Sequence, residues 1–162
     1  MTGIPTVNNG IWGAAYYLLL LLIVAALAVH DVQYRRVPDL ALAYFAPYVC
    51  LSLPVNYFTF GFQSFGIFLG DVLLGAFLGG ITLLAAALAT KGGIGGGDIK
   101  LTFLLGIVYG HCGILLILFI AAPSALLFGL IKRLFCGEKT IRLAFVPFIL
   151  FGCVLTTLLK FM

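Results

Sequence analysis

Long apolar segments separated by short polar connections dominate the sequence. Most of them have the length of about 20 residues that a helix needs to cross the roughly 30 Å hydrocarbon core of a bilayer. The pattern predicts six membrane-spanning helices, over the approximate residues 11–29, 40–57, 66–90, 101–109, 113–131 and 143–159. The fourth is too short to cross unless it begins near Asp98, and we expect the chain to turn after it at Gly110 and His111.

The composition agrees with a membrane protein. Charged residues make up 9% of the 162 positions and apolar residues 64%, whereas about a quarter of a typical soluble domain is charged. We therefore expect an all-α, polytopic membrane protein whose residues 1–162 form a single transmembrane domain. The predicted helices leave no room for a soluble domain of any size.

Charge and cysteine content exclude several other classes of protein. The net charge of +4 is small and no basic patch is interleaved with aromatic residues, so nucleic-acid binding is not expected. Four cysteines stand singly without a CxxC motif, which predicts neither a zinc site nor a disulfide framework; they are Cys50, Cys112, Cys136 and Cys153. We expect no metal and no cofactor.

The distribution of basic residues predicts the orientation in the membrane. One of the nine, Lys160, follows the last apolar segment, and the other eight lie in or beside the connections after the first, third and fifth. They are Arg35, Arg36, Lys91, Lys100, Lys132, Arg133, Lys139 and Arg142. Because basic loops stay in the cytoplasm, we expect a cytoplasmic (inner) membrane protein with both termini on the non-cytoplasmic side. Asp31 and Asp98 then lie at the same, cytoplasmic face.

A glycine-rich stretch, KGGIGGGDIK over residues 91–100, interrupts the apolar pattern. Five glycines in six positions surround Ile94 and run directly into Asp98. Glycine allows positive φ and close approach of another backbone, so the stretch is typical of a tight connection or a cradle for an extended peptide. A carboxylate at such a break is a candidate functional group, because burying it costs several kcal/mol unless it is paired or hydrated.

Asp31 is the second candidate acid, at the end of the first predicted helix. The helix dipole disfavours a negative charge there by about 0.3–1 kcal/mol, so another interaction is expected to hold it. Two carboxyl groups that meet share a proton, leaving one as a general base and the other as an acid. Such a pair can activate water against a peptide bond, and we identify Asp31 and Asp98 as its candidate members.

These residues carry a resemblance to a known family. Gly93, Gly95, Gly97 and Asp98, followed by Lys100, resemble the GxGxGDxK signature of the type IV prepilin peptidases, which are GxGD aspartyl proteases of membranes. Asp31, with Pro38 and Asp39 downstream, resembles the family's other aspartate and its following Pro-Asn or Pro-Asp. The segment 145–148, Phe-Val-Pro-Phe, is similar to the family's Pro-Phe-Gly-Pro-Phe, with Ala144 and Val146 in place of the first proline and the glycine.

The resemblance implies an enzyme, an aspartic endopeptidase that cuts the short basic leader from a pilin-like precursor just before its hydrophobic helix. Asp31 and Asp98 would be the catalytic pair, and Gly93, Gly95, Gly97 and Lys100 would form a supporting or substrate-binding loop. The expected partners are the prepilin or pseudopilin precursor and the lipid bilayer.

The short loops set a limit to the resemblance. Longer family members carry a cytoplasmic insertion with paired CxxC motifs and also methylate the new N-terminus, and this chain has no room for it. The compact form is similar to the peptidases that serve tight-adherence (Flp) pili or pseudopilins, and more distantly to the archaeal preflagellin peptidases.

A second interpretation is a small transporter or channel subunit in which a glycine-broken helix and intramembrane carboxylates bind an ion or proton. It predicts acids near the middle of the bilayer and an inverted internal repeat, which the sequence does not show. A peptidase instead predicts both acids at one face.

Structural roles are the alternative for each polar residue. The glycine stretch could be a flexible turn, and Asp31 could be neutralised by Arg35 or Arg36. We expect Asp39 to cap the second helix and Asp71 to have an interfacial or helix-packing role. The other polar residues are expected at the membrane interface, the histidines as interface residues and the lysines as anchors at the lipid headgroups; they are His30, His111, Lys91, Lys100 and Lys160.

Overall fold

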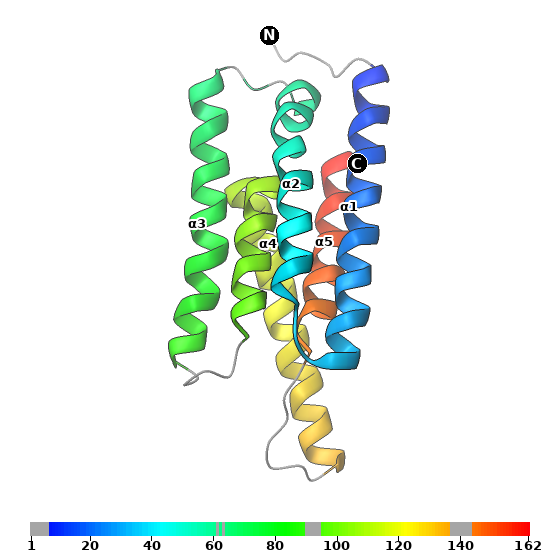
Figure 1. Cartoon of the computed structure of the whole chain (residues 1–162), viewed down its shortest axis with the longest axis vertical. Helices are drawn as coiled ribbons and strands as arrows, with labels where there is room; N and C mark the ends of the chain where they lie inside the picture. The colour runs from blue at the N-terminus through cyan, green and yellow to red at the C-terminus, as the bar shows by residue number, and fades with distance from the viewer. Residues whose placement is uncertain (1–6, 61, 63, 90–94, 137–143) are drawn as a thin grey trace.

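The computed structural model describes residues 7–60, 62, 64–89, 95–136 and 144–162, and its regular structure is entirely α-helical (Figure 1). The helices are α1 (Val7–Tyr34), α2 (Asp39–Phe60), α3 (Phe65–Ala89), α4 (Gly96–Cys136) and α5 (Val146–Phe161). Within the described ranges, four helices are long and apolar enough to cross a membrane, and α5 is a shorter apolar helix. The prediction of an all-α, polytopic membrane protein is confirmed.

The bundle has two distinguishable ends. The connection between α1 and α2, the end of α3 and the starts of α4 and α5 lie at one end, which also carries Asp31 and Asp98 (Figure 1). We call this the aspartate end. The start of α1 and the end of α5 point the opposite way, as the alternation of predicted spans requires.

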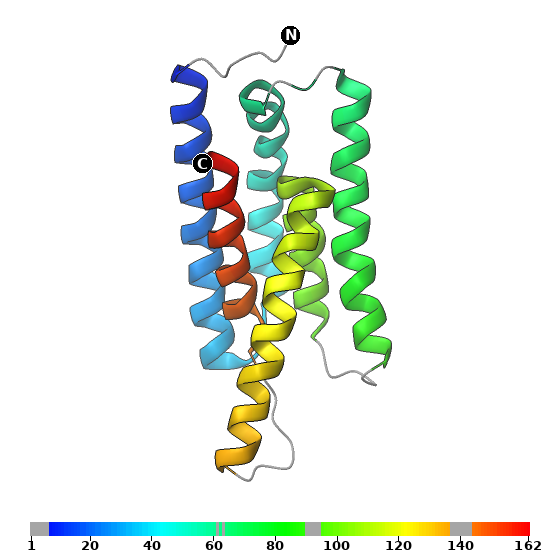
Figure 2. The ribbon, with the colours of Figure 1, turned by 180° about the vertical axis from the view of Figure 1, so that it is seen from behind.

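Helix α4 is folded back on itself at Gly110. This residue has φ 71° and ψ −177°, values outside the helical region. Figures 1 and 2 show a first arm (residues 96–109) that runs away from the aspartate end and a second arm (residues 111–136) that returns and extends beyond the other helices. The two arms are the predicted fourth and fifth helices, and the predicted turn at Gly110 is confirmed.

Asp71 of α3 fixes this turn. Its carboxylate Oδ1 accepts the backbone N–H of His111 at 2.9 Å and also contacts the His111 ring nitrogen Nδ1. A carboxylate at the first N–H groups of a helix satisfies a donor that has no partner within the helix and complements the helix dipole. A Cβ atom at Gly110 would overlap this carboxylate. The prediction that Asp71 has a packing role is therefore confirmed.

Glycines on α3 bring α3 and α4 into backbone contact. Gly75 lies against the backbone of Gly106 and Gly110, and Gly79 lies against the carbonyl oxygen of Thr102, with no space for a Cβ atom at either position. Small residues allow such close helix packing in lipid, where no hydrophobic effect drives helices together. The first arm of α4 is consequently held at a fixed depth along α3.

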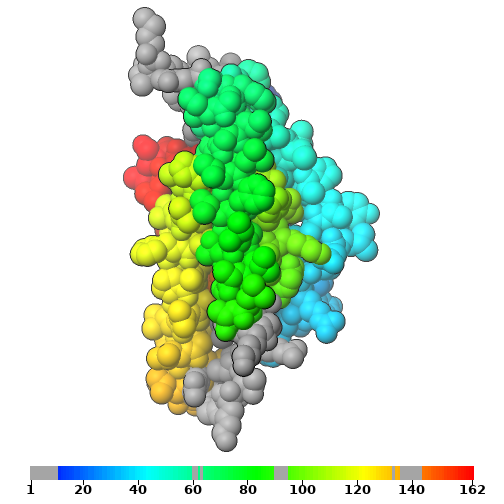
Figure 3. All heavy atoms as spheres, turned by 90° about the vertical axis from the view of Figure 1, so that its left-hand side faces the viewer, coloured from blue at the N-terminus to red at the C-terminus, as the bar shows by residue number. Residues whose placement is uncertain are grey.

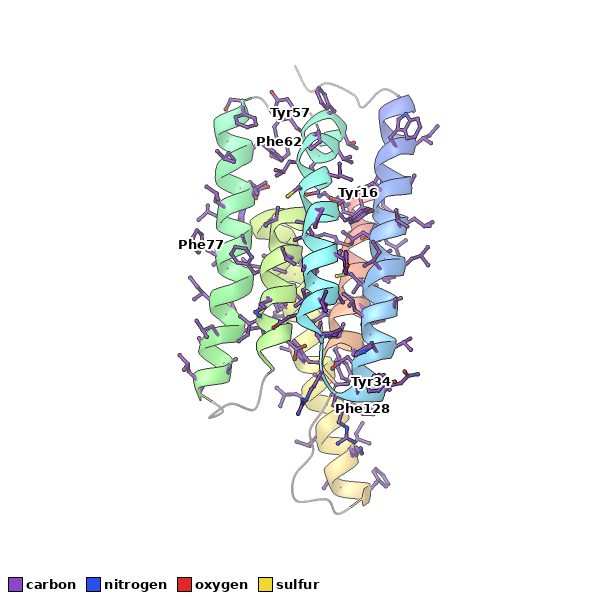
Figure 4. The ribbon with its side chains drawn as sticks, in the orientation of Figure 1. Tyr16, Tyr34, Tyr57, Phe62, Phe77 and Phe128 are labelled. Atoms are coloured by element: carbon purple, nitrogen blue, oxygen red, sulfur yellow. The ribbon has the colours of Figure 1, made fainter. Side chains whose placement is uncertain are left out.

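The core takes residues from all five helices, and the lipid-facing side is apolar as well. Fully buried side chains include Tyr17, Phe45, Leu101 and Ile149. Large apolar side chains also point outward from the helices (Figure 4), and many of them are more than half exposed. This distribution fits a bundle solvated by hydrocarbon.

One predicted role is wrong. Lys160 does not serve as a terminal headgroup anchor, because its Nζ turns inward, donates a hydrogen bond to the Tyr17 hydroxyl at 2.7 Å and lies 5.0 Å from the Tyr17 ring centroid. The same hydroxyl donates to Asn56 Oδ1 at 2.7 Å, and Asn56 Nδ2 donates to the Val108 carbonyl at 2.7 Å. This polar network joins α1, α2, α4 and α5 close to the turn of α4, and it partners the lysine better than the bilayer surface does.

The glycine contact on α3 generates a stability prediction. Gly75→Ala should lower the free energy of unfolding in detergent micelles by about 1–3 kcal/mol, because the new methyl group meets backbone atoms that cannot move aside. Gly70→Ala is the matched control on the same helix, since nothing lies within 4 Å of the position that its methyl group would take. Equal unfolding midpoints for the two variants would contradict the tight α3–α4 packing.

Candidate active site

The structure brings the two predicted acids together. Asp31 from α1 and Asp98 from α4 are 4% and 8% exposed, and Asp31 lies close enough to act electrostatically on the Asp98 carboxyl group. Their helices are separated in sequence by the whole of α2 and α3. The prediction that both lie at the same end of the bundle is confirmed.

Asp31 is held by the start of α5. Its Oδ2 accepts the backbone N–H of Val146 at 3.2 Å, and Val146 is the first residue of α5. The first N–H groups of a helix have no partner within it and carry the positive end of the dipole. They offset the unfavourable position of Asp31 in the last turn of α1. This is the additional interaction that the sequence required.

The backbone leaves α1 at Arg35, one helical turn after Asp31. The N–H of Arg35 donates to the Asp31 carbonyl at 2.7 Å, and Arg35 has φ 52°, which is the left-handed conformation common where helices end. Among the ion pairs of the described residues, none joins Asp31 to Arg35 or Arg36. The alternative in which an arginine neutralises Asp31 is therefore not supported.

Asp98 lies in the first turn of α4 and is held by Gly95. Its backbone N–H donates to the Gly95 carbonyl at 3.1 Å, and its carboxylate accepts the Gly95 N–H in return. The carboxylate contact with the residue before the helix is the side-chain half of a capping box, and Gly95 has no side chain to supply the other half. This contact orients the carboxylate back over the start of the helix, where the dipole favours negative charge.

Gly97 is the glycine of the motif with a clear steric role. A Cβ atom there would lie 2.8 Å from Val37 Cβ and 2.9 Å from the Val37 carbonyl oxygen. Only glycine allows the first turn of α4 to contact the connection between α1 and α2. Gly96, by contrast, has open space around it. Gly93, the remaining glycine of the predicted loop, lies outside the described residues.

Lys100 connects the same turn of α4 to α2. Its Nζ lies 2.7 Å from Asp39 Oδ1, with both side chains more than half exposed. An exposed ion pair of this kind contributes about 0–1 kcal/mol, so it orients the two helices more than it stabilises them. Asp39 stands in the first turn of α2, and its carboxylate accepts the hydrogen bond from Lys100.

Sequence reasoning missed the contribution of Val146. The only signal was the similarity of residues 145–148 to a family segment, and a backbone donor leaves no side-chain signature. His30, the neighbour of Asp31, has its ring nitrogen Nδ1 3.1 Å from the Arg36 carbonyl oxygen and does not orient the acid. Among the described residues, no three His, Cys, Asp or Glu side chains are grouped as a metal site.

The fold and site define a multi-pass membrane protein with two buried carboxyl groups at one end of a helix bundle. Comparison with known proteins then gives the family. Residues 18–131 match the type IV leader peptidase family, and the chain belongs to it.

A curated protein is similar to part of the chain. The chain is 31% identical over 88 residues to the prepilin leader peptidase/N-methyltransferase of Bacillus subtilis (strain 168), a match that covers 54% of this chain and 32% of the relative. The match therefore spans about a third of that protein. No solved structure matches the chain significantly.

Proposed function

We propose that this protein is a membrane aspartyl endopeptidase that removes the basic leader from type IV prepilin-like precursors. The observation that carries the proposal is the convergence of Asp31 and Asp98 in a buried site at one end of the bundle. Membership of the leader peptidase family supports the substrate class. Among precursors of this class, we propose those of tight-adherence (Flp) pili or pseudopilins.

The proposed reaction is direct hydrolysis by the carboxyl pair. The ionised carboxylate takes a proton from water while the neutral carboxyl group donates its proton to the carbonyl oxygen of the peptide bond. The hydroxide equivalent forms a tetrahedral intermediate, which collapses as a proton passes to the leaving amine. Because the proton is shared, acid and base are properties of the pair rather than of either residue alone.

The site is suited to this reaction because each carboxylate has a fixed position. The Val146 N–H holds one oxygen of Asp31, and the Gly95 N–H holds Asp98. Both donors come from backbone at a helix start and are oriented before substrate arrives, which lowers the cost of reorganisation during the reaction.

The proposed location of the site is the cytoplasmic face of the inner membrane. Arg35, Arg36, Lys100 and Lys132 belong to connections or helix ends at the aspartate end of the bundle. The positive-inside rule assigns such an end to the cytoplasm. A basic leader that remains in the cytoplasm would reach the aspartates there.

The transporter interpretation has less support. It predicted carboxylates near the middle of the bilayer, whereas Asp31 and Asp98 are at one end of the bundle, and the family is one of peptidases. N-methylation is not part of the proposal, because the sequence lacks the CxxC pairs of the longer family members.

Removal of either acid tests the catalytic pair. Asp31→Asn and Asp98→Asn should each lower the rate of leader cleavage by at least about a hundredfold, because general acid and base catalysis contributes about 10²–10⁴-fold. Pilin-like precursors with a short basic leader and an apolar helix would be co-expressed with each variant. Cleavage would be followed by gel mobility and mass spectrometry, with membrane content and melting temperature as controls for folding. Native-like cleavage by one variant would remove that residue from the pair.

The α5 hydrogen bond can be tested by removing one backbone N–H. Incorporation of the α-hydroxy acid analogue of valine at Val146 replaces the N–H with an ester oxygen and keeps the side chain. Cleavage should slow at least about tenfold, because a hydrogen bond to a charged group contributes about 1.5–3 kcal/mol. The same replacement at the lipid-exposed Val154 controls for loss of a helical hydrogen bond. Equal rates at the two positions would show that Val146 does not support Asp31.

The close contact of Gly97 gives a third test. Gly97→Ala should reduce cleavage by about ten- to a hundredfold, because the added methyl group separates α4 from Val37 and displaces the Asp98 carboxylate. Gly96→Ala adds the same methyl group in open space and should leave cleavage within about twofold of the native rate. A similar loss in both variants would contradict the assigned steric role.

A further inference from the structure

An apolar groove of about 600 Å³ lies between α2 and α3, with the first arm of α4 as its floor. Leu42 and Ala43 line it from α2, Ile81 and Leu84 from α3, and Phe103 from α4. Figure 3 shows the first arm of α4 on the molecular surface between α3 and the neighbouring α2. The groove is open on the side of the bundle that faces lipid.

Among the described residues, the ring contacts between α2 and α3 lie at the end opposite the aspartates. There the Tyr57 ring of α2 lies 5.6 Å from the Phe68 ring, and Phe62 lies 4.9 Å from Phe68 (Figure 4). Towards the aspartate end the two helices are connected through α4. The groove lies between these ring contacts and the aspartate end of the bundle.

The groove reaches the turn of α4 that carries Asp98, although Asp98 itself does not line it. Ile99 and Lys100, which directly follow Asp98, line its end, and the ion pair of Lys100 with Asp39 lies there as well. A helix bound in the groove would contact apolar side chains along most of its length. At the aspartate end it would contact the charged side chains of Lys100 and Asp39. The Asp39 side chain is 73% exposed, and its partner in the structure is Lys100.

We infer that this groove binds the apolar helix of the precursor, with the start of that helix at the aspartate end. The inference rests on the proposed function. A peptide at this depth must satisfy its backbone groups internally, so the occupant is a helix rather than an extended chain. Ala43 and Gly80 provide small positions against which a second helix packs closely.

Charge complementarity fixes the direction of this helix. The leader that precedes it is basic, and the Asp39 carboxylate at the aspartate end of the groove would exchange its exposed ion pair with Lys100 for a basic residue of the leader. The peptide bond between leader and helix then lies beside Asp98. The groove would thus select precursors by their apolar helix. The aspartates would cleave the peptide bond that joins the leader to this helix.

Filling the groove tests the inference. Ala43→Trp places a large ring in the groove, and Tyr44→Trp changes the adjacent residue of α2, which is 79% exposed and does not line the groove. With a precursor that the native chain cleaves, Ala43→Trp should raise KM at least about tenfold with little change in kcat, and Tyr44→Trp should leave KM within about twofold. Melting temperatures identify a variant that fails to fold.

A crosslinking experiment keeps the inference testable if Ala43→Trp is unstable. The photoreactive residue p-benzoylphenylalanine would replace Leu84 in the Asp98→Asn chain, which retains the precursor uncut, and would replace Leu88, 74% exposed and outside the groove, as the control. Crosslinks from position 84 should map to the apolar helix of the precursor by mass spectrometry. Crosslinks to lipid alone, or equal precursor yields from positions 84 and 88, would overturn the inference.

The two proposals fail in distinguishable ways. If the native chain cleaves the precursor but groove variants keep the native KM, docking in the groove is wrong and the peptidase stands. If the native chain cleaves no prepilin-like precursor, the proposed function is wrong and the docking inference falls with it.

Discussion

The hydrogen bond from the Val146 N–H to the Asp31 carboxylate satisfies the main physical constraint on this structure. An acid buried at the end of an apolar bundle requires a partner, because an uncompensated charge there costs several kcal/mol. The partner is the start of α5. The end of α1 and the start of α5, which are far apart in sequence, therefore lie side by side at Asp31. Asp98 is then added to a position that is already polar.

Two glycine contacts bring Asp98 to that position. Gly75 draws the first arm of α4 against α3, and Gly97 draws its first turn against Val37 in the α1–α2 connection. The turn at Gly110, capped by Asp71, keeps this arm short and returns the chain to the aspartate end. The close packing therefore serves to position the Asp98 carboxyl group, and the gap left between α2 and α3 provides the groove beside it.

Much of this architecture is predictable from the sequence because membrane insertion imposes simple rules. Apolar length predicts the helices, glycine predicts the turn at Gly110, and the arginines and lysines place Asp31 and Asp98 at one end. Contacts between distant segments are not predictable in this way. The Val146 N–H has no side-chain signal, and the inward turn of Lys160 depends on Tyr17, which lies on the first helix.

The proximity of the two acids in the membrane is the most direct test of the proposed chemistry. Asp31→Cys and Asp98→Cys would be combined in a chain whose native cysteines are replaced, and a short bifunctional thiol reagent would be applied in lipid vesicles. We expect efficient crosslinking of this pair, detected by mass spectrometry, and none between Asp98→Cys and Asp71→Cys at the opposite end of the bundle. Failure of the first pair to crosslink, while both thiols react singly, would contradict the convergence on which the proposed chemistry depends.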